Sequence, residues 1–296
     1  MARATSFLKV WSRRVAPLAA VMALGGCTTL DAVNALQPRN GVGVIQDLSY
    51  GEGPRRKLDV YTPPGDRKSA PLVVFFYGGG WETGDRKDYR FVGTALAAKG
   101  FVVIVPDYRL YPEARWPAFL QDGAQAVRWA RDHAGQYGGD PGKLVLMGHS
   151  AGAYNAAMLA VDDRWLTGVG LDPTRDVRAL VGISGPYDFL PLRSEVLKAV
   201  FGPETQRPAT QPVNQNLAGA PPAWLGTGGA DKVVMPRNTE SLAAKLRAAN
   251  VPVETHLYPR LGHGLTIGAF AGPLRLAAPV LKDVSGFIAS HTSDRP

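Results

Sequence analysis

A serine held between glycines is the first feature of this sequence that could do chemistry. Ser150 lies in the pentapeptide GHSAG at residues 148–152, after an apolar run that ends at Met147 and before a small-residue stretch typical of a helix. This order of strand, sharp turn and helix exposes a serine hydroxyl as a nucleophile. The same five letters also arise by chance in a glycine-rich chain, where the serine would only cap a helix. Whether Ser150 is a nucleophile or only a helix cap therefore depends on which residues could act as its catalytic partners.

A serine hydroxyl becomes an effective nucleophile when an imidazole accepts its proton and a carboxylate orients that imidazole. His263 lies in LGHG, just after the last expected strand, at the sheet edge where Ser150 also emerges. His149 lies in the pentapeptide itself, where its ring cannot readily turn back on the next hydroxyl. The remaining histidines lie on an expected helix, an expected strand and a polar tail, and they are His133, His256 and His291. We expect His263 to be the general base.

Two aspartates between Ser150 and His263 follow expected strands and are candidates for the acid of a catalytic triad. Asp231 follows the run AWLGTGG, next to the strand that leads to His263. Asp188 follows ALVGIS, where an aspartate more often braces its own loop. We favour Asp231, which gives the chain order Ser, Asp, His.

A glycine run follows the apolar strand LVVFF at residues 72–76. Three consecutive glycines in YGGGW, residues 77–81, allow peptide N–H groups to face a substrate oxygen, and the amide of Ala151 would add another donor. The alternative is a plain tight turn, although such a turn rarely needs three glycines. The sequence therefore predicts an oxyanion hole built from these segments.

Alternating apolar runs and helical patterns predict an α/β fold with a mostly parallel central sheet and helices on both faces. Residues 58–61 alternate like an edge strand, and residues 280–288 form the stripe of a closing amphipathic helix. Residues 186–222 show little periodicity and many prolines, so we expect an excursion over the carboxyl edge of the sheet, and whether it forms a lid is left open. The continuous apolar runs expected as buried strands are 72–76, 101–105, 144–147, 179–184 and 223–228.

The first 27 residues differ from the rest. The chain has 296 residues and a formal net charge of +8, and four basic residues without an acid precede the apolar run 15–24. This pattern predicts a secretory signal over residues 1–26, and its removal would leave a net charge of +4. No basic run interleaved with aromatic residues follows, so nucleic-acid binding has little support. We expect a tether over residues 27–44 and one catalytic domain over residues 45–296.

Cys27, the only cysteine, ends the signal in Leu24-Gly25-Gly26-Cys27. This segment resembles a bacterial lipobox. The resemblance implies lipidation of Cys27 and a lipid anchor in a membrane, with Thr28 rather than an aspartate in the next position pointing to the outer membrane, facing the periplasm. A signal cleaved elsewhere is the alternative.

Further motifs make the chain similar to α/β-hydrolases of the hormone-sensitive-lipase-like and BD-FAE-like carboxylesterase family, over about residues 58–288. In chain order they are YGGGW, DYRL with Pro112 and Glu113, YGGDP at 137–141, GHSAG, ADKVV and LGHG. The resemblance implies a triad of Ser150, Asp231 and His263, and oxyanion donors at Gly79, Gly80 and Ala151. Tyr77 stands where the family usually has histidine.

These features favour a serine carboxylesterase that cleaves small to medium acyl esters through an acyl-enzyme, without a cofactor or metal. Trp81 and Tyr187 are candidates for walls of the acyl pocket, although either could be core. A formamidase or amidase, as among the kynurenine formamidases related to this family, would use the same triad. A non-catalytic binding protein on the same scaffold is the third hypothesis. The sequence predicts neither the oligomeric state nor the physiological ester.

Overall fold

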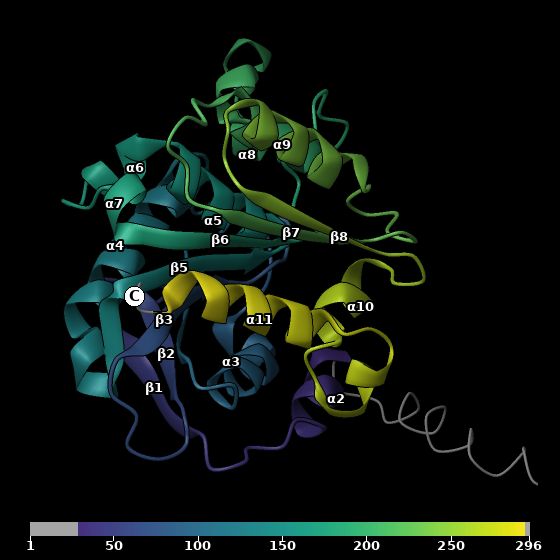
Figure 1. Ribbon diagram of the computed structural model, residues 1–296. Coiled ribbons are helices and arrows are strands. Elements are labelled where there is room, and N and C mark those ends of the chain that lie inside the picture. Colours follow the sequence, from purple (N-terminus) through teal and green to yellow (C-terminus); the bar gives the residue numbers. More distant parts are fainter. Residues whose placement is uncertain (1–28, 294–296) are drawn as a thin grey trace, which may run out of the picture.

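The computed structural model describes residues 29–293, and within this range eight strands form a single sheet (Figure 1). Their order across the sheet is β1-β2-β4-β3-β5-β6-β7-β8. Strand β2 pairs antiparallel with both of its neighbours, and all pairs from β4 to β8 are parallel. The bounds of the strands are β1 (Gly43–Ser49), β2 (Lys57–Thr62), β3 (Ala70–Phe76), β4 (Val102–Pro106), β5 (Gly139–His149), β6 (Val177–Ile183), β7 (Ala223–Gly228) and β8 (Val253–Tyr258).

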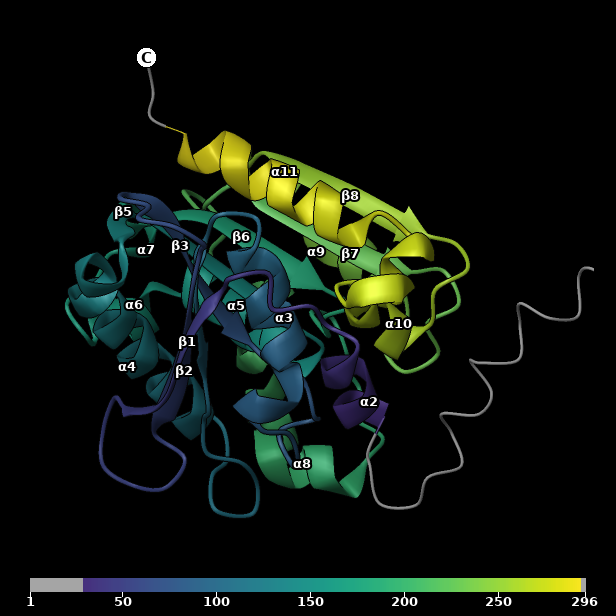
Figure 2. The same cartoon turned by 90° about the horizontal axis from the view of Figure 1, so that it is seen from below.

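The longer helices cover both faces of the sheet, as the two views in Figures 1 and 2 show. Helices α3 (Arg90–Ala97) and α11 (Val280–Thr292) pack on one face, while α4 (Ala118–His133), α5 (Ala151–Val161) and α9 (Arg237–Ala248) pack on the other. None of the helices within residues 29–293 combines the length and apolarity needed to cross a membrane.

Shorter helical segments lie in the connections. The α-helices among them are α2 (Thr29–Ala35), α6 (Asp163–Thr167), α7 (Pro173–Asp176), α8 (Glu195–Phe201) and α10 (His263–Gly268). The 3-10 helices are η2 (Arg86–Tyr89), η3 (Ala134–Tyr137), η4 (Glu204–Thr210), η5 (Pro212–Asn214) and η6 (Gly272–Leu276).

The central strands confirm the prediction of a mostly parallel sheet. Every residue of β4 and β7 is buried, as is nearly all of β3, because helices cover both faces. This is why these strands appear in the sequence as continuous apolar runs. The predicted closing helix is also confirmed, as α11.

The structure differs from the expectation at the amino-terminal side of the sheet. Residues 58–61 were expected to form an edge strand, but β2 lies between β1 and β4 and is largely buried. The edge is β1. Its first residues, and helix α2 before it, fall in the segment expected as a tether. The side chain of Asn34 fixes α2, since it donates to the carbonyls of Lys87 and Asp88 and accepts from the amide of Phe91.

The segment 186–222 passes over the carboxyl edge of the sheet, as predicted, and contains α8, η4 and η5. Its first part packs beside Ser150, where Pro186, Phe189 and Leu192 line a cavity. The amide of Trp116 donates to the carbonyl of Val200, which ties α8 to the residues before α4. The excursion is therefore part of the wall around the site.

Candidate active site

Ser150 occupies a strained turn between β5 and α5. Its φ is 55° and its ψ is −126°, a conformation that non-glycine residues seldom adopt. Two glycines allow this turn to approach its neighbours. A Cβ at Gly148 would lie 2.2 Å from the carbonyl oxygen of Gly152, and a Cβ at Gly152 would lie 2.1 Å from that of Phe76. The glycines predicted around the serine are thus required by backbone contacts.

Hydrogen bonds join the three residues predicted to form a triad. The Nε2 atom of His263 lies 2.8 Å from Oγ of Ser150, and its Nδ1 atom lies 2.8 Å from Oδ2 of Asp231. Ser150 follows β5, Asp231 follows β7 and His263 begins α10 after β8. These parallel strands all end at the same edge of the sheet, which is why the three residues meet.

The carboxylate of Asp231 is fully buried and held by its own loop. Its Oδ1 atom accepts hydrogen bonds of 2.9 Å from the amides of both Val233 and Val234, which leaves Oδ2 for His263. Asp188, the other candidate, lies in the β6 to α8 loop, where its amide donates to Asn238. The geometry therefore selects Asp231 as the partner of His263.

The glycine run after β3 forms a compact loop beside Ser150. Gly79 and Gly80 have φ values of 136° and 63°, and a Cβ at Gly79 would lie 2.0 Å from the carbonyl oxygen of Thr83. Within residues 29–293 the amides of these two glycines donate no hydrogen bond to a backbone oxygen. Both glycines and Ala151 line cavities that contain Ser150. This arrangement leaves peptide donors for a substrate oxygen, as an oxyanion hole requires.

Tyr77 braces the glycine loop where the resembled family has histidine. Its hydroxyl donates to Oδ1 of Asp107 and accepts from Arg55, while its carbonyl accepts from the hydroxyl of Tyr108. The Tyr77 and Tyr108 rings stack with centroids 4.8 Å apart. Burial raises the pKa of Tyr77 well above its usual value, so the phenol stays neutral and can donate. A tyrosine can therefore support this loop.

His149 supports the loop of the catalytic imidazole, a role that the sequence pattern did not reveal. Its Nε2 atom lies 3.3 Å from the carbonyl oxygen of His263, and the two rings are 4.9 Å apart. Burial, followed by the neighbouring His263, lowers the pKa of His149 to about 3. The ring is therefore neutral, and Nε2 carries the proton donated to the carbonyl.

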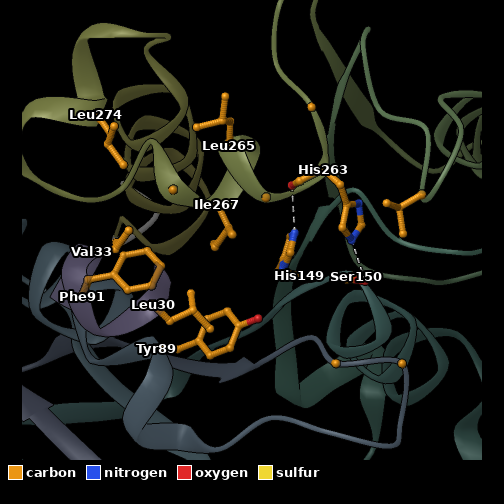
Figure 3. A pocket seen from close by; sticks show the side chains of 16 residues that line it. Leu30, Val33, Tyr89, Phe91, His149, Ser150, His263, Leu265, Ile267 and Leu274 are labelled. Atoms are coloured by element: carbon orange, nitrogen blue, oxygen red, sulfur yellow. Dashed lines mark hydrogen bonds between the residues drawn. The ribbon is translucent and has the colours of Figure 1, made fainter. Parts of the chain in front are cut away.

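Two cavities meet at Ser150. The first, here called the larger cavity, has a volume of about 640 Å³, and Figure 3 shows it between α2 and α10. Its lining residues are Leu30, Val33, Gly79, Gly80, Tyr89, Phe91, His149, Ser150, Val233, Gly262, His263, Gly264, Leu265, Ile267, Gly268 and Leu274. The second, here called the smaller cavity, has a volume of about 430 Å³ and lies under residues 186–197. Its lining residues are Gly80, Trp81, Ser150, Ala151, Pro186, Phe189, Pro191, Leu192, Arg193, Ser194, Leu197, Val233, Val234, Met235, Arg237 and Asn238.

The two predicted pocket residues have different positions. Trp81 lines the smaller cavity, and its indole N–H donates to Oδ1 of Asn155 at 3.0 Å. Tyr187 lines neither of the two cavities, because its ring is fully buried against Gly182 and Gly185. Of the two alternatives for Tyr187, pocket wall or core, its position fits the core. The next aromatic residue, Phe189, contributes to the smaller cavity instead.

The site brings together a serine hydroxyl, an imidazole and a buried carboxylate. Among residues 29–293, no cluster of three or more His, Cys, Asp or Glu side chains is arranged to hold a metal ion. The arrangement is suited to acyl transfer through serine.

Comparison with known proteins shows that this chain is similar to esterases. The BD-FAE family matches residues 58–246. Esterase LipC of Mycobacterium tuberculosis is 32% identical over 246 residues, which cover 76% of this chain and 61% of LipC. Carboxylesterase NlhH of the same organism is 33% identical over 234 residues, covering 72% of each chain. This chain thus spans less than two thirds of LipC but more than two thirds of NlhH.

A solved structure shares the architecture. The hyperthermophilic esterase from the archaeon Pyrobaculum calidifontis superimposes with a TM-score of 0.72 at 25% sequence identity, and the match covers 88% of both chains. The similarity therefore extends over nearly the whole described fold.

Proposed function

Because the chain belongs to the BD-FAE family of α/β-hydrolases, we propose that it is a carboxylesterase with Ser150 as its nucleophile. The observation that carries this proposal is the continuous pair of 2.8 Å hydrogen bonds from Ser150 through His263 to Asp231. The named relatives are esterases, which fits a carboxylic ester as the substrate.

The acylation half-reaction follows from this geometry. The Oγ atom of Ser150 attacks the ester carbonyl carbon while its proton passes to Nε2 of His263. Asp231 stabilises the imidazolium that forms, and the amides of Gly79, Gly80 and Ala151 are the proposed donors to the oxyanion. The carbon–oxygen bond to the alcohol then breaks, and the alcohol oxygen takes the proton from His263. An acyl-enzyme and a free alcohol result.

Water completes the cycle by the same route. His263 accepts a proton from a water molecule, whose oxygen attacks the acyl carbon of the Ser150 ester. When the tetrahedral intermediate collapses, the proton on Nε2 returns to Oγ of Ser150 and the carboxylic acid leaves. The enzyme regains its starting protonation state.

The test uses p-nitrophenyl acetate with the parent protein and Ser150→Ala. The parent should hydrolyse the ester, and the turnover number of the variant should be lower by a factor of order 10⁶. The melting temperature of the variant should equal that of the parent, which shows that the variant is folded. An N-formyl amide of similar shape, run in parallel, measures the preference for the ester. Substantial turnover by Ser150→Ala would place the nucleophile elsewhere.

We also propose that Cys27 carries a lipid anchor, with the protein in the bacterial cell envelope at the outer membrane. Support comes from the lipobox-like sequence alone, because Cys27 lies outside the described residues. Cys27→Ser should move the protein from the membrane fraction to a soluble or unprocessed pool. Unchanged fractionation would contradict the anchor.

A further inference from the structure

The larger and smaller cavities share Ser150 but differ in the catalytic groups at their inner ends. His263, with its neighbours Gly262 and Gly264, lines only the larger cavity. Ala151, the proposed oxyanion donor after the serine, lines only the smaller one. Gly80 lines both cavities and Gly79 only the larger one, so the catalytic group that distinguishes the larger cavity is the imidazole of His263.

This difference indicates which cavity holds the alcohol part of an ester and which holds the acyl part. The proton on Nε2 of His263 must reach the alcohol oxygen as the carbon–oxygen bond breaks, so the departing alcohol has to lie against the imidazole. The acyl group stays bound to Ser150 and extends away from that ring. An ester placed this way has its alcohol part in the larger cavity and its acyl part in the smaller cavity.

The outer wall of the larger cavity comes from helix α2, which is distant in sequence from the triad. Leu30 and Val33 of α2 face Ile267 and Leu274 across the cavity (Figure 3). Helices α2 and α10 lie side by side in both overall views (Figures 1 and 2). The wall therefore has two halves, one from each end of the described chain.

Two polar side chains hold α2 in this position. Asn34 bonds to the backbone at η2 and at the start of α3. The Oε1 atom of Gln37 accepts from the amide of Gly272 at 3.1 Å and from Arg275 at 3.0 Å. Both side chains are largely buried. Their hydrogen bonds therefore hold α2 against η2 and α3 and against the segment that contains η6.

The lining of the larger cavity indicates which alcohols it accepts. Within the described chain, no Asp, Glu, Lys or Arg side chain lines it, and His149, with its pKa lowered by burial, is neutral. A cavity of this volume and apolar character is typical of sites that take a sizeable apolar group. Resting on the esterase function, we infer that this protein prefers esters of extended apolar alcohols, and that α2 determines this preference.

The first experiment compares alkyl acetates from methyl to hexyl acetate, hydrolysed by the full chain and followed by pH-stat. Their leaving groups have similar basicity, so the trend reports binding of the alcohol. We expect kcat/KM to rise by about fourfold for each methylene that enters the cavity. Butyl acetate should also exceed 2-methoxyethyl acetate, which has a similar shape but a polar ether oxygen.

Tryptophan substitutions separate the two cavities. Leu30→Trp, in α2, should lower kcat/KM for hexyl acetate at least tenfold more than kcat/KM for methyl acetate. Leu197→Trp, which lies in the wall of the smaller cavity, should lower kcat/KM for methyl hexanoate more than kcat/KM for hexyl acetate. Leu36→Trp is the matched control, because Leu36 is 47% exposed and lines neither cavity. Leu274→Ala enlarges the larger cavity from its other wall and should favour branched alcohols.

The outcomes distinguish this inference from the proposed function. A parent protein that hydrolyses none of these esters would overturn the esterase function itself. An active parent without dependence on alcohol length would overturn only the assignment of the larger cavity. The assignment would also be overturned if Leu30→Trp reduced hydrolysis of methyl hexanoate more than that of hexyl acetate.

Discussion

At the scale of single residues, the reactivity of Ser150 depends on how its partners are held. Asp231 accepts from two backbone amides and from His263, so all of its strong interactions stabilise one orientation of the carboxylate. A carboxylate held this way keeps the imidazole in the tautomer that accepts a proton at Nε2. In the proposed mechanism, Asp231 is thus a positioning and electrostatic partner that does not contact the ester.

Replacement of Asp231 should separate catalysis from binding. Asp231→Asn is expected to lower kcat by about 10⁴ with little change in KM, because the wrong tautomer is favoured and the imidazolium loses its counter-charge. The matched control is Asp188→Asn, which should change kcat less than twofold. Steady-state kinetics on p-nitrophenyl acetate measure both. A larger loss in the Asp188 variant would reverse the assignment.

His149 should couple folding to pH. Its pKa is lowered to about 3 in the folded protein, whereas an exposed histidine titrates near 6.5, so between these values only the unfolded chain takes up the proton. The stabilising contribution is complete above pH 6.5 and is lost as the pH falls toward 3, by about 1.4 kcal/mol per pH unit. Urea unfolding of the parent and of His149→Asn, measured from pH 7 to pH 4, gives the free energy of unfolding at each pH. This free energy should change less steeply with pH in the variant than in the parent. Equal slopes would contradict the account.

The role of a residue could be predicted from the sequence where both its chemical type and its position after a predicted strand pointed to the same site. Ser150, Asp231 and His263 follow strands that end at one edge, so their meeting could be foreseen. The contact of His149 with the carbonyl of His263 joins residues 114 positions apart and has no local signal. The sequence left Tyr187 open as pocket wall or core, because burial against Gly182 cannot be seen in a loop sequence.

At the scale of elements, the close approach of β3 and α5 builds the site. The turn before α5 lies against the carbonyls that end β3, and this contact places Ser150 beside the glycine loop. Only a residue without a side chain fits at Gly152, so the sequence signature of the turn follows from packing rather than from the chemistry of serine.

A pair of glycine substitutions tests this packing. Gly152→Ala should lower the free energy of unfolding by about 3 kcal/mol, because its Cβ would meet the carbonyls of Phe76 and Tyr77 within 2.4 Å. Gly286→Ala, in α11, has open space around the new Cβ and should be neutral or stabilise by up to about 1 kcal/mol. Denaturant unfolding of both variants gives the comparison. Equal stabilities would show that the turn can relax.

Elements differ in how well their sequence predicts them. The buried parallel strands have continuous apolar runs, and these were predicted. Strand β1 was not, because a register shift between Ile45 and Leu48 breaks its alternation and most of its residues are partly exposed. Helix α2 has only seven residues, and its role as a cavity wall depends on residues of α10 and η6 that line the same cavity only in the folded chain.

At the scale of the whole molecule, all parts of the site lie at the carboxyl edge of the sheet. The glycine loop follows β3, the serine follows β5, the acid follows β7 and the base follows β8. The excursion at residues 186–222 closes one side of this edge, and α2 closes the other.

The division into a signal, a tether and a catalytic domain stays a prediction at its first boundary. The packing of α2 extends the folded part back to residue 29, since Asn34 and Gln37 fasten this helix to the hydrolase core. A shortened chain that begins at residue 45 would lack one wall of the larger cavity.

Covalent labelling tests most directly whether Ser150 is the nucleophile. A fluorophosphonate mimics the tetrahedral intermediate and bonds to a serine only when an imidazole removes its proton. Intact-mass analysis and peptide mapping should find one adduct per chain, on Ser150, and ester hydrolysis should fall in proportion to labelling. Ser150 would not be the nucleophile if hydrolysis persisted in fully labelled protein, or if hydrolysis was lost through an adduct on a different residue.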